Sequence, residues 1–128
     1  MAGEAHNEGW HQRMVIKWTQ QESIRRKWPE LKLLYHVPNE RRCTQQQGRL
    51  LKLEGVKSGV PDLALPVPKG QYHGLYIEMK TLTGHTRPEQ EWWLAELNYQ
   101  GYYCKVCHGW ESAVRALEWY MQLQGGDL

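Results

Sequence analysis

The sequence contains no phenylalanine, and its aromatic side chains are seven tryptophans and seven tyrosines. Most of these rings are expected in the core, because large rings dominate buried area, while others are suited to stacking on exposed bases. Only three cysteines occur, and an odd number argues against a framework of disulfide bonds and fits a reducing compartment. The composition therefore excludes a small scaffold held together by disulfides.

Long apolar runs are also missing, so the sequence predicts no transmembrane helix and no membrane partner. Residues 1–8 lack the basic and apolar regions of a secretory signal peptide, which predicts a location in the cytoplasm. The formal net charge is only +2, so overall charge does not mark a nucleic-acid binder. Basic residues instead form local groups, which are residues 25–27, Arg41 with Arg42, and Lys52 with Lys57.

With 128 residues, the chain is expected to form a single domain over 1–128, with its core at about 8–122. Apolar spacing predicts helices at 8–28, at 44–53, from 86–89 to Gly101, and at 110–121. Strands are predicted at 31–37, 61–66, 74–80 and 102–107. The order αβαββαβα predicts an α/β fold with a mixed four-stranded sheet flanked by helices. In the second helix, Leu50, Leu51 and Leu53 are expected to be buried.

Asp62, Glu78 and Lys80 are the residues with the clearest chemical potential. Glu78 and Lys80 alternate with apolar residues along one strand, and Asp62 begins the strand before it, so a hairpin brings the three together. Hard oxygen ligands hold Mg²⁺ or Mn²⁺, and the backbone carbonyl of Met79 is a further candidate ligand. The other interpretation is a surface ion pair between Lys80 and either carboxylate, which would stabilise the fold by less than about 1 kcal/mol. The triplet beginning at Glu30 has the same form without an upstream acid.

Several longer motifs around these residues resemble one known family. They are Gly-Val-Lys-Ser-Gly-Val-Pro-Asp-Leu-Ala-Leu-Pro-Val-Pro at 55–68, Tyr-His-Gly-Leu-Tyr-Ile-Glu-Met-Lys at 72–80, Pro-Glu-Gln at 88–90 and Gly-Tyr at 101–102. Together these segments resemble the virus-type replication-repair nuclease (VRR-NUC) domain of the PD-(D/E)xK superfamily, over about residues 8–120. The resemblance implies a restriction-endonuclease-like fold and a small stand-alone member of phage or bacterial type, acting in the cytoplasm of a bacterial or phage-infected cell.

The resemblance also implies residue roles. Asp62, Glu78 and Lys80 take the family's catalytic positions, Gln90 matches the glutamine that opens the following helix, and Mg²⁺ or Mn²⁺ is the implied cofactor. The family has a further glutamate in the first helix. Glu8 fits its spacing to Gln12 best, as a metal ligand, and Glu22 takes the role if the register differs.

One loop departs from the family pattern. Many relatives carry Pro-Asn-Gly-Gly after the first strand, whereas this chain has Pro-Asn-Glu-Arg-Arg at 38–42. Glycines let a loop approach a phosphate more closely than a loop carrying Glu40 can, so a phosphate-binding role of this loop stays open. Arg41 and Arg42 are candidate contacts to the DNA backbone, as are Lys57 and Ser58 in the loop before Asp62.

The implied function is a divalent-metal-dependent DNA endonuclease acting on branched DNA, such as four-way junctions or flaps, and leaving 5′-phosphate and 3′-hydroxyl ends. Paired cuts across a symmetric junction would require a homodimer. Two alternatives remain open at this stage. One is a DNA-binding module of the same fold without turnover, and the other is a nuclease that acts on RNA or single strands.

Residues 104–108 match the Cys-x-x-Cys-His pattern of haem attachment, but the sequence predicts no haem there. The two cysteines are an odd number of positions apart in a predicted strand, so their side chains point to opposite faces. The six histidines also lack the paired spacing of a zinc site.

Overall fold

The computed structural model describes residues 5–38 and 44–124. Its helices are α1 (Glu8–Gln20), α2 (Glu22–Lys27), α3 (Gln45–Leu53), α4 (Pro88–Tyr99) and α5 (Trp110–Met121), with a 3-10 turn η1 (Pro29–Leu33). The strands are β1 (Tyr35–His36), β2 (Leu63–Leu65), β3 (Leu75–Lys80) and β4 (Tyr103–His108). None of the helices in these ranges is long and apolar enough to cross a membrane.

The strands form one mixed sheet in the order β1-β2-β3-β4. The β1–β2 and β2–β3 pairs are antiparallel, with Leu63 opposite Ile77, and β3 runs parallel to β4, with Lys80 opposite His108. The crossover from β3 to β4 is made by α4, as a parallel pair requires. The predicted α/β fold with a four-stranded mixed sheet and flanking helices is confirmed.

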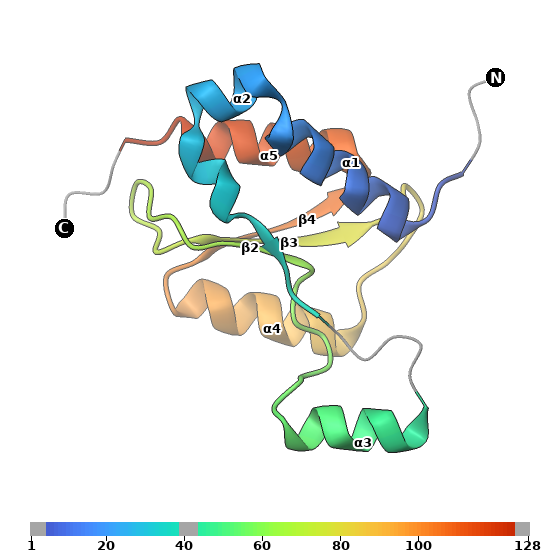
Figure 1. Ribbon diagram of the computed structural model, residues 1–128. Helices are drawn as coiled ribbons and strands as arrows, with labels where there is room; N and C mark the ends of the chain where they lie inside the picture. Colours follow the sequence, from blue (N-terminus) through green and yellow to red (C-terminus); the bar gives the residue numbers. More distant parts are fainter. Residues whose placement is uncertain (1–4, 39–43, 125–128) are drawn as a thin grey trace.

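Helices cover both faces of the sheet (Figure 1). Helices α1 and α5 lie together on one face, where Leu75, Ile77 and Met79 of β3 are buried in the main apolar cluster. Helix α4 lies on the other face, toward which the intervening side chains of β3 point. The alternation of β3 therefore places Glu78 and Lys80 under α4.

Two predicted elements differ from the structure. The helix predicted over 8–28 is broken at Gln21, whose backbone is extended. The buried Thr19 hydroxyl donates to the Ile16 carbonyl, and this type of bond bends helices. The strand predicted over 31–37 is mostly the 3-10 turn that begins at Pro29, which leaves only Tyr35–His36 paired in the sheet.

Helix α3 forms where it was predicted, but its leucines are not in the core. Thr44 caps it, since the Thr44 hydroxyl accepts from the Gln47 backbone N–H and the Gln47 side chain accepts from the Thr44 N–H. No side chain of α3 is buried, and Leu50 and Leu53 are exposed. The expected burial of these leucines is wrong within this chain, because α3 stands beyond α4, away from the sheet (Figure 1).

Candidate metal and catalytic site

Asp62 lies just before β2 and is held there by hydrogen bonds to its backbone carbonyl and to its side chain. Its carbonyl accepts from the Val37 N–H at 2.8 Å and lies 3.0 Å from Nδ1 of His36. Its side chain is buried, and Oδ2 accepts from the backbone N–H of Met79 at 2.8 Å. The carboxylate thus adds one more hydrogen bond between the two chain segments, next to the Leu63–Ile77 pair of β2 and β3.

Glu78 is 1% exposed, and its two carboxylate oxygens have different surroundings. Oε2 accepts from Nε2 of Gln90 at 3.1 Å and lies 3.7 Å from Nζ of Lys80. Oε1 is buried and has no hydrogen-bond partner among residues 5–38 and 44–124. Burial, followed by the charge of nearby Asp62, raises the pKa of Glu78 to about 8.

Lys80 ends β3 and is buried beside Glu78. Its backbone carbonyl accepts from the Gly109 N–H at 2.9 Å, which fixes the strand end against the start of α5. The ion pair with Glu78 is therefore present but does not lie at the surface. By contrast, Glu30 of the similar triplet lies 3.7 Å from Lys69 and is 39% exposed at its side chain, so context separates the two triplets.

The donor atoms fit a hard divalent cation. The N–H and C=O of a strand residue point to the same side, so the Met79 carbonyl faces the side on which its N–H meets Asp62. Asp62, Glu78 Oε1 and this carbonyl are all oxygen donors, as Mg²⁺ and Mn²⁺ prefer. Among the described residues, no group of three or more His, Cys, Asp or Glu side chains is close enough to hold a metal. The fit consequently rests on two carboxylates and one carbonyl.

Gln90 connects α4 to the carboxylates through both ends of its amide. Its Oε1 accepts from the Arg87 N–H at 2.9 Å at the start of the helix, while Nε2 donates to Glu78. Because the first bond assigns the oxygen, the amide nitrogen must face the carboxylate. The hydrogen bond to Arg87 at the helix start therefore orients Nε2 of Gln90, which is the only neutral side-chain donor to Glu78 among the described residues.

Glu8 enters the site from the opposite layer. It lies in the first turn of α1, which Asn7 caps by accepting the Trp10 N–H at 2.8 Å. The buried His11 ring accepts from the Trp110 N–H at 3.1 Å, and this contact fixes α1 against α5. The negative charge of Glu8 is one of the causes that raise the pKa of Glu78, although Glu8 does not complete a cluster of three carboxylates.

The VRR-NUC domain model matches residues 6–111 of the chain. The chain belongs to the VRR-NUC family. A solved structure described as a VRR-NUC domain protein has a TM-score of 0.82 and 26% sequence identity, covering 98% of this chain and 96% of that chain. No curated protein matches the sequence. The fold is accordingly of nuclease type, and the family suggested by the motifs is confirmed.

Three other candidate residues, Glu22, Lys57 and Ser58, lie outside this cluster. Glu22 is on α2, pairs with Arg26, and has a side chain that is 85% exposed, so the structure brings Glu8 and not Glu22 toward the site. Lys57 and Ser58 are exposed, and the Ser58 carbonyl accepts from the Trp93 indole N–H at 3.0 Å. Arg41 and Arg42 lie outside the described residues.

Sequence reasoning missed the residues that position the cluster. His36 was interpreted only as one of six scattered histidines, yet its ring lies against the Asp62 carbonyl. His11 secures the helix that carries Glu8. The available signal for His36 was its place at the end of the strand that pairs with the Asp62 segment. No local signal existed for His11.

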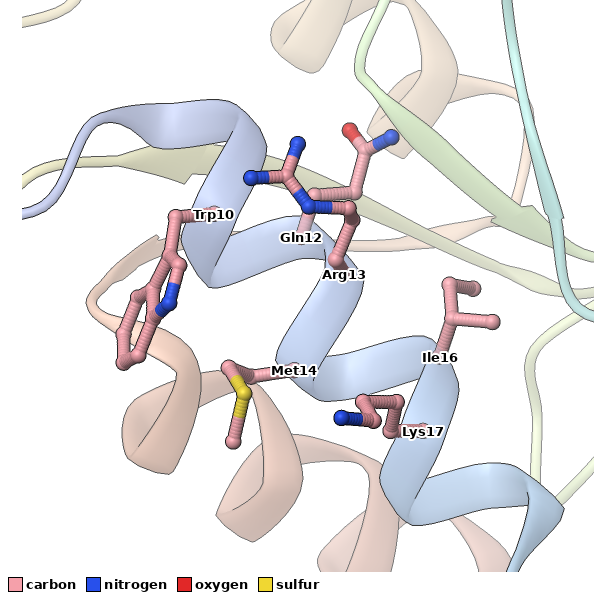
Figure 2. A pocket seen from close by; sticks show the side chains of 6 residues that line it. All are labelled: Trp10, Gln12, Arg13, Met14, Ile16 and Lys17. Atoms are coloured by element: carbon pink, nitrogen blue, oxygen red, sulfur yellow. The ribbon is translucent and has the colours of Figure 1, made fainter.

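A hollow along the outer side of α1 is separate from this site. Figure 2 shows the side chains that line it, which are Trp10, Gln12, Arg13, Met14, Ile16 and Lys17. None of them is a carboxylate or one of the residues predicted for metal binding. Cys104 and Cys107 are likewise removed from the cluster, in β4, and burial raises the pKa of both thiols to about 11.

Gly59 brings the loop before Asp62 onto the first turn of α4. Its φ is +90°, and an added Cβ would lie 2.8 Å from the backbone of Glu89. We expect Gly59→Ala to lower the free energy of unfolding by about 2 to 4 kcal/mol, from backbone strain and overpacking. Gly55→Ala is the matched control, since φ is +100° with nothing within 4 Å, and should cost only about 1 kcal/mol. Equal losses in urea unfolding would contradict the close approach.

Proposed function

We propose that this VRR-NUC protein is a divalent-metal-dependent DNA endonuclease that hydrolyses phosphodiesters. The observation that carries the proposal is the buried group of Asp62, Glu78 and Lys80, in which Oε1 of Glu78 has no hydrogen-bond partner in the part of the chain that the structure describes. Asp62, Glu78 and the Met79 carbonyl would hold Mg²⁺ or Mn²⁺, with Glu8 approaching from α1. A bound cation would stabilise charge on the phosphate and make a coordinated water more acidic.

The electrostatics of the two buried carboxylates favour catalysis over simple DNA binding. Asp62 and Glu78 place two buried carboxylates side by side, and burial together with the charge of Asp62 raises the pKa of Glu78. Such a pair destabilises the folded chain and would also repel a polyanion unless a cation lies between them. A module that only binds DNA gains nothing from this arrangement, whereas a hydrolase needs it.

Lys80 and Gln90 supply N–H donors, which the carboxylates lack. The Lys80 ammonium, 3.7 Å from Glu78, supplies three N–H donors that would orient the attacking water and offset charge on a phosphate oxygen. Gln90 donates to Oε2 of Glu78, so Oε1 would be the atom available to hold a cation. Lys57 and Ser58, in the exposed loop before Asp62, would contact the DNA backbone, as would Arg41 and Arg42.

The substrate is proposed to be branched DNA, with four-way junctions and flaps as the leading forms. The family resemblance supports this choice. Symmetric cutting of a junction needs two active sites related by a two-fold axis, because one chain contains one such cluster. A homodimer is therefore part of the proposal.

Cleavage across a panel of nucleic acids tests the proposal. Labelled four-way junction, flap, duplex, single-stranded DNA and single-stranded RNA would each be incubated with Mg²⁺, Mn²⁺ or EDTA. We expect metal-dependent cleavage of the branched forms, none in EDTA, and none with Asp62→Asn. Binding without cleavage in every metal would leave only the DNA-binding alternative. Equal cleavage of RNA and single strands would remove the junction preference.

A further inference from the structure

The outer side of α1 combines an aromatic ring with two cations. Trp10, Arg13, Met14 and Lys17 follow a spacing of three and four residues, so they lie within about 100° of one another around the helix. These four residues form the outer stripe of α1, and the buried residues of the helix lie on its other side. Arg13 and Lys17 are exposed, whereas Trp10 and Met14 are half-buried. The outer stripe therefore faces away from the sheet and is open to a partner.

The outer stripe borders the hollow shown in Figure 2, which has a volume of about 410 Å³. This volume lies in the range of sites that hold small molecules, so the hollow can admit a ring of the size of a nucleobase. Met14 and Ile16 give it apolar walls, and none of the six side chains that line it is acidic. An anionic partner consequently meets no like charge among these side chains.

Trp10 already carries a flat heterocycle on one face. The His6 imidazole stacks on the indole, with ring centroids 3.6 Å apart and an interplanar angle of 11°. The buried His11 ring meets the same indole nearly at a right angle, with centroids 4.9 Å apart, and braces it. A nucleobase is also a flat nitrogen heterocycle. Trp10 and His6 thus form a platform of the kind on which unpaired bases stack.

Arg13 and Lys17 are placed to contact phosphates beside this platform. They are four residues apart, which is about 6 Å along the helix axis and close to the spacing of successive phosphates in an extended strand. The Arg13 guanidinium reaches back toward the helix start, because a Cβ added at Gly9 would lie 3.4 Å from its Nη1. The two cations therefore lead from the end of α1 that carries Glu8 outward along the helix.

We propose that the outer stripe of α1 binds an unpaired DNA strand, with one base stacked on the platform of Trp10 and His6 and phosphates at Arg13 and Lys17. Glu8 lies two residues before Trp10, so the strand would leave the metal site at the start of α1 and continue along its outer side. Paired bases stay stacked inside a duplex, so the stripe would select unpaired nucleotides beside the cut. The inference rests on the proposed DNA nuclease and names a part of its substrate.

The combination of rings and cations decides between two partners of matching charge. Aromatic rings on which bases stack, set in a positively charged groove, are the pattern that binds single strands. An acidic protein segment would match the cations but has no flat ring for the platform. The structure therefore favours a nucleic acid, and variants of the ring and of the cations separate the two partners.

Binding without cleavage tests the proposal. Fluorescence anisotropy in EDTA would measure the affinity of the whole chain for a labelled oligothymidylate of about ten nucleotides and for a blunt duplex of the same length. We expect Trp10→Leu, which keeps an apolar side chain but no ring, to bind the single strand about tenfold or more weakly, with unchanged salt dependence. Trp10→Tyr keeps a ring and should bind within about threefold of wild type.

Removal of the two cations should have a different signature. Arg13→Ala with Lys17→Ala should weaken binding about tenfold and reduce the slope of log affinity against log salt by about 1.4, as for two phosphates of a single strand. Arg49→Ala with Lys52→Ala is the matched control, because it takes the same charge from exposed positions on α3. The control should stay within about threefold of wild type. Circular dichroism checks that every variant is folded.

Four results would each overturn the proposal. They are a wild type that does not bind the oligothymidylate, a folded Trp10→Leu protein with wild-type affinity, an equal loss of duplex binding in that variant, and equal losses for the α1 and α3 pairs. Unchanged affinity in every α1 variant would overturn it in favour of a protein partner. These measurements need no metal, so cleavage without this binding would remove the inference alone, and this binding without cleavage would remove only the proposed nuclease activity.

Discussion

Lys80→Ala is expected to lower the single-turnover rate of DNA cleavage by about 10³-fold or more. The Lys80 ammonium is buried 3.7 Å from Glu78, and among the described residues it is the only group whose charge lowers the pKa of that carboxylate. Its removal takes away both the donor for water and phosphate and the charge that helps Glu78 to ionise. The loss should therefore appear in the rate at saturating metal, while affinity for DNA changes little.

Lys105→Ala is the matched control for this prediction. Lys105 lies on the neighbouring strand β4, opposite Ile77, and its side chain is exposed. The rate of that variant should stay within about twofold of wild type, as for most exposed substitutions. Thermal unfolding of both variants separates loss of activity from loss of structure. A folded Lys80→Ala protein that cuts within tenfold of wild type would exclude Lys80 from the chemistry.

Glu78→Gln is expected to stabilise the metal-free protein at alkaline pH while abolishing cleavage. The ordinary pKa of 4.5 holds in the unfolded chain, and the folded value is about 8. Between these values the folded state binds more protons than the unfolded state, so the free energy of unfolding falls as pH rises and levels off above about 8. Glutamine does not titrate, so the variant should lack this decline and exceed wild type by a few kcal/mol at pH 8 or above.

Divalent metal should make wild type more stable than Glu78→Gln, the reverse of the order expected without metal. A cation at Oε1 favours the ionised carboxylate, so Mn²⁺ or Mg²⁺ should raise the unfolding temperature of wild type and have little effect on Glu78→Gln. Urea unfolding at pH 5 to 9, in EDTA and in metal, measures both effects. The exposed Glu54, changed to Gln, is the control and should follow wild type throughout. A wild-type pH profile identical to that of Glu78→Gln would refute the buried, protonated carboxyl.

The proximity of Asp62, Glu78 and Lys80 could be predicted because it follows from local rules. Strand alternation puts Glu78 and Lys80 on one face, and the antiparallel pairing of β2 with β3 returns that face to Asp62. Their burial could not be predicted, because it depends on how α4, the crossover between β3 and β4, packs on the sheet and places Gln90 against Glu78. Residue pattern alone accordingly left a surface ion pair as the alternative interpretation.

The break in the predicted first helix depends on side-chain hydrogen bonds between near neighbours, and the position of Glu8 depends on a distant one. No glycine or proline occurs near Gln21, and the break depends on Thr19, whose carbonyl accepts from Nε of Arg25 while its hydroxyl is turned back to Ile16. The position of Glu8 depends on a hydrogen bond between His11 and Trp110, near opposite ends of the sequence. Local propensity contains no information on either contact.

The hydrogen bond between the Val37 N–H and the Asp62 carbonyl joins the two ends of the chain segment between them, so this segment forms a closed loop. Closing such a segment depends only weakly on its length, since each doubling costs about 0.6 kcal/mol. With no α3 side chain buried in the core, α3 can change in length without disturbing the carboxylates, whereas the end of the loop, from Ser58 onward, packs on α4. A change in the length of α3 is therefore expected to leave the chemistry of the cluster unchanged.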